Sequence, residues 1–255
     1  MDLPRLENWG NTRISLHNAA QLTGALRRAL LPPMPNGLRF SQQVIRDGLS
    51  TGRLPDGSRF DLDYAYMTLR YFAPNTEKPQ NFILQDKPAA AALDWIRECV
   101  PDATINTDDL PAAPLTVDFY QARDYALMQW QVFTAMARFR AQLLGMMTPA
   151  VVWTHGFDLS FLWFKGNEAD EKQQPHINFG FSPGSPGFDD PYLYVYNWSP
   201  DKGAQTITPS SPARWNTDGF TGVVVDYKVL LRYAHPEAFI AGVYDEAHRL
   251  MAPLL

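Results

Sequence analysis

The chain has 255 residues but only one cysteine, Cys99, and only 19% charged residues. A single cysteine excludes an internal disulfide and a zinc site built from several thiolates. The net charge is −5 and basic runs are absent, which argues against nucleic-acid binding, because Lys and Arg supply its affinity by neutralising phosphates. No signal-peptide pattern opens the sequence, and His155 and Asp158 interrupt its longest apolar run. We therefore expect a cytoplasmic protein that binds neither nucleic acid nor membrane.

Local catalytic signatures are also missing. The sequence contains no G-x-G-x-x-G, Walker A, H-E-x-x-H, G-x-S-x-G, Cys-x-x-Cys or EF-hand pattern. The nucleophile types Cys99, Ser160, Ser182 and Ser185 lack a neighbouring base or a nucleophile elbow. The sequence thus assigns no catalytic residue, metal ligand or cofactor, and any active site must be assembled from distant positions.

Aromatic residues are plentiful, with 7 Trp, 11 Tyr and 15 Phe. Such side chains fill a thick core or line a pocket with large, stiff faces. Apolar periodicity and turn signals predict three classes of segment. The helices are expected at 13–31, 88–100, 119–145 and 236–252. The strands are expected at 38–45, 49–54, 60–72, 80–85, 176–181, 192–198 and 220–227, with two more inside 148–166 and a short one at 103–106. The remaining segments are turns and loops, including the rest of 101–118, 182–191 and 199–219.

This order lacks alternating strand–helix–strand units, which argues against a parallel sheet. It predicts an α+β fold, with antiparallel sheets packed against helices. We expect one domain over 1–255, or two similar halves at about 1–110 and 111–255.

The best candidate site surrounds the stretch 148–166. It reads as two apolar strands bent around the polar turn His155-Gly156-Phe157-Asp158. Asp158 fits either a ligand-facing carboxylate or a turn carboxylate that accepts backbone N–H groups. Trp153 and Phe157 supply apolar walls beside it.

The first helix carries a polar stripe in which His17, Gln21, Gly24 and Arg28 share one face. The glycine lets another element approach closely. The stripe fits either a histidine satisfied within the fold or a ligand-binding face. Elsewhere, Asp61 and Asp63 alternate along a strand and could form a paired-carboxylate site. We expect a solvated strand face instead, because no basic or metal-binding residue lies beside them in sequence.

The chain resembles an uncharacterised bacterial family, domain of unknown function 5996. The resemblance begins at Trp9 and covers nearly the whole chain. Its motifs are Leu16-His17 with Gln21 and Gly24, Gly48-Leu-Ser-Thr51, Phe139-Arg140, Gly145-x-x-Thr148-Pro149 with Trp153 and Gly156-Phe157-Asp158-Leu159, His176 with Gly180-Phe181 and Pro183-Gly184, and Tyr227. The family tends to have a small residue such as serine where His155 stands. The resemblance adds weight to His17, Gln21, Asp158 and His176, and it implies no activity.

Three hypotheses follow. The first is a small ligand bound in an aromatic-lined pocket, with His17, Gln21, Asp158 and His176 as polar groups and Trp153, His155 and Phe157 beside them. The second is a metal-dependent hydrolase or oxygenase that uses the same histidines and aspartate. The third is a structural or protein-interaction role, in which the histidines are satisfied inside the fold.

Overall fold

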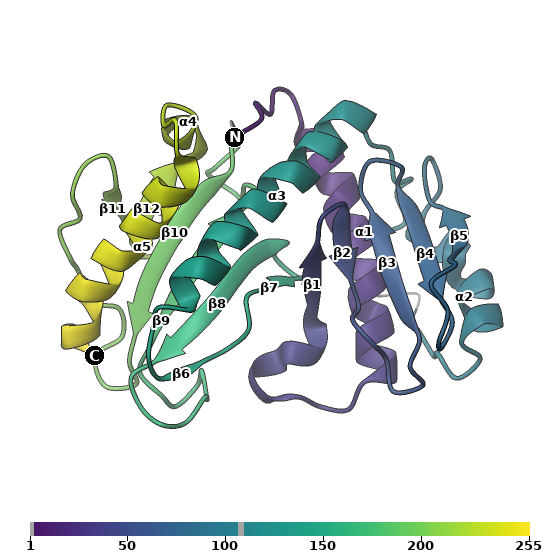
Figure 1. Ribbon diagram of the computed structural model, residues 1–255, viewed down its shortest axis with the longest axis horizontal. Coiled ribbons are helices and arrows are strands. Elements are labelled where there is room, and N and C mark those ends of the chain that lie inside the picture. Colours follow the sequence, from purple (N-terminus) through teal and green to yellow (C-terminus); the bar gives the residue numbers. More distant parts are fainter. Residues whose placement is uncertain (1–2, 107–109) are drawn as a thin grey trace. The chain divides into compact units, whose positions relative to one another are not determined.

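The computed structural model describes residues 3–106 and 110–255, and it confirms the α+β class with antiparallel strands (Figure 1). Contacts between residues divide the chain into two compact units. The N-terminal unit comprises Leu6–Trp130 and Val152–Phe157. The C-terminal unit comprises Met1–Arg5, Gln131–Val151 and Asp158–Leu255.

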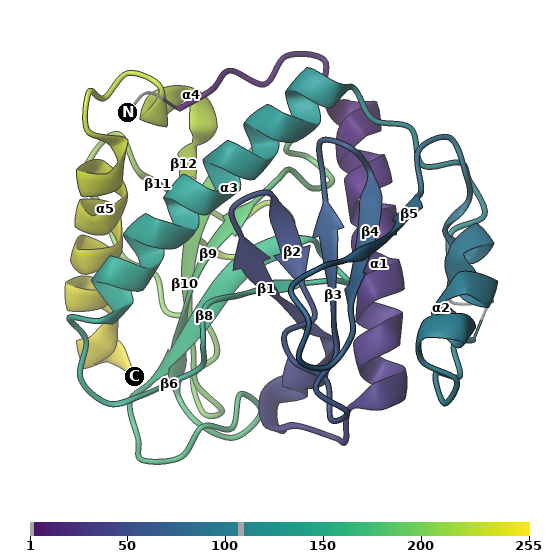
Figure 2. The same ribbon diagram turned by 45° about the vertical axis from the view of Figure 1, so that its right-hand side comes forward.

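The N-terminal unit contains a sheet in the order β7-β1-β2-β3-β4-β5, with every neighbouring pair antiparallel. The helix α1 lies along one face of strands β1 to β5 (Figure 2). The bounds of its elements are α1 Gly10–Leu30, η1 Pro35–Phe40, β1 Ser41–Ile45, β2 Gly48–Ser50, β3 Arg59–Asp63, β4 Thr68–Phe72, β5 Gln80–Ile83, η2 Ala89–Ala92, α2 Leu93–Cys99 and β7 Val151–Trp153.

One predicted strand of this unit is a hairpin instead. Residues 60–72 form the two strands β3 and β4, which are joined by a turn. Asp63 Oδ1 accepts a hydrogen bond from the Tyr66 amide at 3.0 Å, and Met67 takes a left-handed φ of 42°. The aspartate side chain therefore stabilises a turn that period-two alternation in the sequence conceals.

The C-terminal unit contains a sheet in the order β11-β12-β10-β9-β8, with the short strand β6 also paired to β8. The division between the units falls inside α3. The bounds are α3 Phe119–Arg140, β6 Met146–Met147, β8 Asp158–Phe164, β9 His176–Ser182, β10 Tyr192–Trp198, β11 Arg214–Asn216, β12 Gly222–Asp226, α4 Tyr227–Leu230, α5 Pro236–Met251 and η4 Ala252–Leu254.

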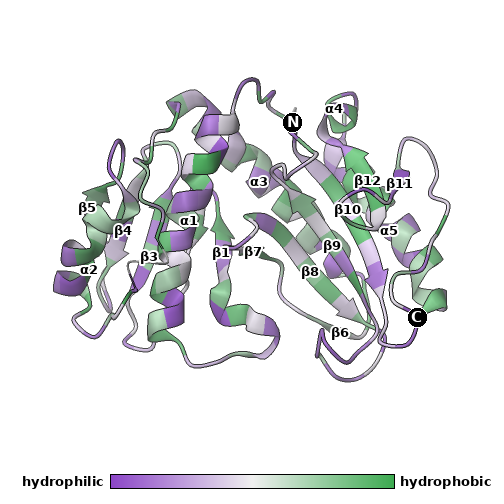
Figure 3. Cartoon of the chain, turned by 180° about the vertical axis from the view of Figure 1, so that it is seen from behind, coloured by the Kyte–Doolittle hydropathy of each residue, from purple (hydrophilic) through white to green (hydrophobic). Residues whose placement is uncertain are grey.

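One face of this second sheet packs against helices. Phe139 of α3 contacts Phe179 of β9 and Tyr244 of α5, with ring centroids 5.2 and 5.6 Å apart. Phe161 of β8 stacks on Phe179 at 5.0 Å. Figure 3 shows strands β8, β9 and β10 from the opposite side, with α3 and α5 behind them. Across the described residues, none of the helices combines the length and the apolar character needed to cross a membrane.

Candidate functional site

The polar turn predicted as the centre of the site is residues 154–157, between β7 and β8. The Phe157 amide donates to the Trp153 carbonyl at 2.7 Å and closes the turn. Phe157 has a φ of 59°, which a residue with a Cβ rarely adopts, and its side chain is buried. Burial of the Phe157 ring thus offsets the cost of the unfavourable backbone conformation.

Helix α1 holds this turn through His17. The imidazole stacks on the Phe157 ring, with centroids 5.6 Å apart and planes 8° apart. His17 Nε2 lies 3.0 Å from the Thr154 carbonyl oxygen. Because a carbonyl only accepts, Nε2 carries the hydrogen and donates it. Burial lowers the pKa of His17, so the ring is neutral at pH 7. The single N–H group of the neutral ring is used in the hydrogen bond to the turn.

The rest of the polar stripe on α1 completes this contact. The Gln21 side chain lies beside the imidazole, with its Nε2 3.4 Å from His17 Nε2; because that ring nitrogen carries the hydrogen, the two nitrogens are neighbours and not a hydrogen-bonded pair. A Cβ at Gly24 would lie 2.4 Å from Thr154 Oγ1, so only glycine admits the turn at this distance. Thr154 Oγ1 in turn donates to the Phe40 carbonyl at 2.9 Å. Gly24 and Thr154, 130 positions apart in sequence, are therefore in direct contact. The sequence predicted such a close approach of another element at this glycine.

Two of the predicted site residues border this contact. His155, at the tip of the turn, is exposed, and Trp153 is half-buried. Their ring centroids are 6.3 Å apart. The N-terminal unit thus brings together His17, Gln21 and Phe157, and leaves His155 on the outside.

The C-terminal unit contains a second cluster, on the sheet face opposite its helices. Alternation along the strands and the register of the ladders place its members on one face. We call it the tyrosine face and define it by Asp158 and Ser160 of β8, His176, Asn178 and Gly180 of β9, and Tyr194, Tyr196 and Trp198 of β10.

The ring of Tyr194 lies across Gly180, which is its partner in the ladder. A Cβ on this glycine would lie 2.0 Å from Tyr194 Cζ. The glycine lets the ring pass flat over β9, and the Tyr194 hydroxyl donates to Asp158 Oδ2 on β8. Burial raises the pKa of Tyr194 well above its usual value, and the Asp158 charge adds to the rise. Tyr194 is therefore a stable donor to Asp158 rather than an acid.

Asn178 lies at the centre of the tyrosine face, opposite Tyr196 in the ladder. Its Nδ2 donates to the Tyr196 hydroxyl at 2.9 Å. Its residue exposure is only 8%, yet Oδ1 has no hydrogen-bond partner among the residues that the structure describes. Turning the amide over would only exchange the two ends, so one buried polar atom remains without a partner in either orientation.

His176 lies next to Asn178 on the same face and is also buried. Its Nδ1 donates to the Gln174 carbonyl at 2.9 Å, which leaves the lone pair of the neutral ring on Nε2. Burial lowers the pKa of His176, which favours this neutral form. The ring lies 5.3 Å from Trp198 and 5.8 Å from Phe164, between aromatic side chains.

Asp158 and His176 do not converge. In the β8–β9 ladder His176 pairs with Phe164, at the far end of β8 from Asp158. Six residues of strand separate them, which corresponds to about 20 Å. We expected the Asp158 carboxylate and the His176 imidazole to contact one compact ligand. The register contradicts this expectation, because antiparallel pairing puts the two side chains at opposite ends of the β8–β9 hairpin.

Asn178, Tyr194 and Tyr196 were not predicted as site residues from the sequence. The available signal was the period-two pattern in both strands: His, Asn and Gly alternate from 176 to 180, and Tyr, Tyr and Tyr alternate from 192 to 196. Pairing of the two strands places the two rows side by side. Only the register shows which tyrosine faces which residue.

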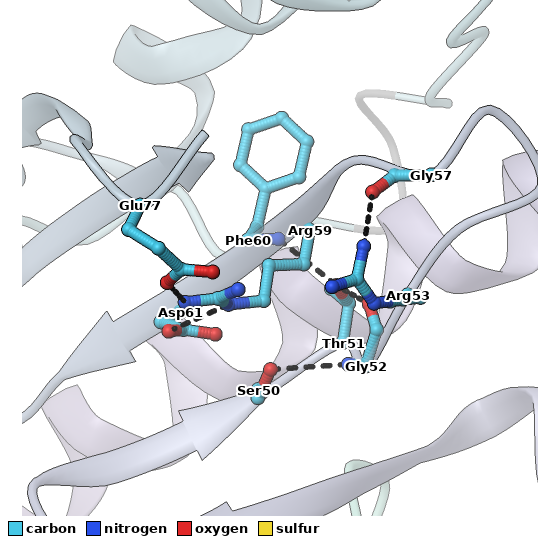
Figure 4. A network of polar contacts seen from close by, with 9 residues as sticks. All are labelled: Ser50, Thr51, Gly52, Arg53, Gly57, Arg59, Phe60, Asp61 and Glu77. Carbon is cyan, nitrogen blue, oxygen red and sulfur yellow. Dashed lines mark hydrogen bonds and ion pairs between the residues drawn. The ribbon is translucent and has the colours of Figure 1, made fainter. Parts of the chain in front are cut away.

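The carboxylates of β3 form a different cluster, which is buried rather than solvated. Asp61 accepts from Arg59 Nε at 3.3 Å, and Arg59 also lies 3.5 Å from Glu77 (Figure 4). Asp63 forms an ion pair with Arg70 across the β3–β4 ladder. The prediction of a solvated strand face was wrong, because cross-strand and same-strand arginines cover both aspartates.

Within residues 3–106 and 110–255, no three His, Cys, Asp or Glu side chains gather in a geometry that holds a metal ion.

Comparison with curated proteins and with solved structures found no match. Comparison with family models found one that covers almost the whole chain, residues 2–254. Among the residues that carry the resemblance, His17, Gln21 and Gly24 lie at the contact between α1 and the turn, whereas Asp158, His176 and Gly180 lie on the tyrosine face. The chain therefore belongs to the family described as Family of unknown function (DUF5996).

Proposed function

We propose that this protein binds a small polar ligand on the tyrosine face of its C-terminal unit. Asn178 supplies the central polar contact, Tyr196 and His176 flank it, and Trp198 supplies an apolar wall. Asp158 orients Tyr194 at one end of the face. His17 and Gln21, which were candidate ligand-binding groups, position the turn that leads into β8.

The single observation that carries the proposal is the buried, unpartnered amide atom of Asn178. Burying an amide atom without a hydrogen bond costs about 1–3 kcal/mol. Folded proteins keep few such atoms, and each one requires an explanation, such as an ordered water, an ion or a functional role. A leucine of similar size would avoid the cost, so the asparagine is better explained by binding than by stability.

The surroundings of Asn178 support a ligand in preference to a packing role. Tyr196 and Trp198 are half-buried, so parts of both rings are open to a bound molecule. The neutral His176 ring lies against Trp198 and limits the positions that the indole can take. An apolar surface with a few convergent polar groups is the usual composition of a small-molecule site.

The substitution Asn178→Leu tests the proposal, because it separates binding from stability. Its thermal unfolding would be compared with that of the wild type, with and without a panel of sugars, amino acids, nucleosides and organic acids. We expect at least one class to raise the wild-type melting temperature, since a ligand at 100 times its Kd stabilises a protein by about 2.7 kcal/mol. The variant should fold with at least equal stability and lose that increase.

The matched control is Asn81→Leu on β5, an exposed asparagine of the N-terminal unit. It should keep the full response to the same compounds. A loss of more than about 1 kcal/mol of stability in Asn178→Leu, with ligand responses unchanged, would mean that the amide serves the fold and would refute the proposal.

A further inference from the structure

We infer that the ligand of the tyrosine face is a neutral, hydroxyl-rich compound, a saccharide or a cyclic polyol. This inference rests on the proposed function and names its ligand class. It follows from three properties of Asn178, Tyr196, His176 and Trp198: their hydrogen-bonding capacity, their lack of charge and the partial exposure of the two aromatic residues on β10.

Hydrogen-bonding capacity favours hydroxyl groups. The amide of Asn178 leaves Oδ1, an acceptor, available, while the Tyr196 hydroxyl accepts from Nδ2 and keeps its own hydrogen to donate. If the amide is turned over, the available amide atom is a donor and Tyr196 offers a lone pair. A hydroxyl group both donates and accepts, so it satisfies the pair in either orientation. A ligand with donors alone or acceptors alone matches only half of the array.

The polar groups at the centre of the face are neutral. Burial lowers the pKa of His176 and raises the pKa of Tyr196, so neither carries charge at pH 7. The charges that act on Tyr196 are the carboxylates of Asp158 and Glu171, whose influence on its pKa ranks below that of burial. These carboxylates oppose an anionic ligand, and the unpartnered group itself is an uncharged amide.

Shape supplies the third argument. The half-buried Tyr196 lies opposite Asn178 in the ladder, and the half-buried Trp198 lies opposite His176, whose buried ring is 5.3 Å from the indole. The C–H face of a pyranose or inositol ring is a flat apolar patch that packs against aromatic rings. The hydroxyl groups on the edge of such a ring then reach an amide between the aromatic residues. Adjacent side chains thus offer an aromatic surface to the C–H face of the ring and hydrogen-bonding groups to the hydroxyl groups on its edge.

Saturation-transfer difference NMR on the full chain tests this inference, because it detects weak binding. One arm contains hexoses, pentoses, maltose, cellobiose and myo-inositol. The other arm contains the hydroxyl-free probes tetramethylammonium, adenine and acetate. The variants are Asn178→Leu and Trp198→Ala, and the control is Trp215→Ala, a half-buried tryptophan of the same sheet whose ladder partner, Val223, is not on the tyrosine face. Amide spectra of each variant confirm folding.

We expect a compound of the first arm to bind the wild type and the control equally, and to bind each variant at least about tenfold more weakly, the factor that one lost hydrogen bond gives. If only hydroxyl-free probes bind in a variant-sensitive manner, the ligand class is wrong and the proposed ligand face stands. If sugars bind all four proteins alike, binding occurs elsewhere and the inference fails. If no probe gives a variant-sensitive signal, the proposed function falls as well.

Discussion

The substitution Gly180→Ala tests the central geometry of the tyrosine face. A Cβ at this position would lie 2.0 Å from Tyr194 Cζ and 2.4 Å from both Cε atoms. The ring is buried and its hydroxyl is bonded to Asp158, so it cannot move aside without losing that bond. The alanine therefore forces the Tyr194 ring off β9.

The expected cost combines two effects. Overpacking a well-packed site costs about 1–3 kcal/mol. Loss of a hydrogen bond to a charged acceptor costs about 1.5–3 kcal/mol. We expect Gly180→Ala to lower the free energy of unfolding by about 2.5–6 kcal/mol, which is a large part of the 5–15 kcal/mol that a typical domain has.

Urea unfolding followed by circular dichroism and tryptophan fluorescence measures this change. The control is Gly242→Ala in α5, where a Cβ meets nothing within 4 Å. It should stabilise the protein by about 0.5–1 kcal/mol, the usual advantage of alanine inside a helix. In a Tyr194→Ala background, Gly180→Ala should cost less than about 1 kcal/mol, because the ring that it meets is gone. Equal costs in both backgrounds would refute the reasoning.

Two further predictions concern charged and titrating groups. Burial lowers the pKa of His17 and His176 in the folded state. As the pH falls, the unfolded chain therefore takes up protons at these histidines before the folded chain does. The free energy of unfolding that the two neutral rings contribute is present above the unfolded pKa of about 6.5 and is lost as the pH falls below it. Urea midpoints should therefore drop between pH 7.5 and 5.5, and the double variant His17→Gln/His176→Gln should show a smaller drop, whereas exposed His235→Gln should match the wild type. Arg70→Ala should lower the free energy of unfolding by about 1–3 kcal/mol, because it leaves the buried Asp63 carboxylate unpaired. Asp63→Asn in the same background should recover part of that loss. An unchanged urea midpoint for Arg70→Ala would mean that the pair does not stabilise the fold.

Periodicity in the sequence predicted most of the fold. The strand 192–198 and the helix that Pro236 begins match β10 and α5, because strict alternation and a proline at the first turn are strong local signals. Helix α3 ends at Arg140, five residues before the end that was expected at 145. The short strand β11, in the segment expected to be a loop, is stabilised by pairing with β12 and has no pattern of its own.

The candidate site could be predicted only in part. Residue types identified His17 and Gly24 as partners of another element, but a helical stripe does not say which one. Likewise, the sequence shows Asp158 beside a turn and His176 at a strand start, while the distance between them depends on ladder register. The unpartnered atom of Asn178 is a property of packing, so no local pattern reveals it.

Residues 152–157 belong to the N-terminal unit, so this unit cannot be completed until that late segment has been synthesised. Strand β7, which pairs with β1, and the turn held by α1 leave the ribosome only after the whole of α3 has been made. Until then β1 has an unpaired edge at Ser41 and Gln42, where β7 later pairs. A gene fragment that stops at residue 130 would encode a product with that edge permanently open, and a useful fragment must carry the 152–157 segment as a fused strand.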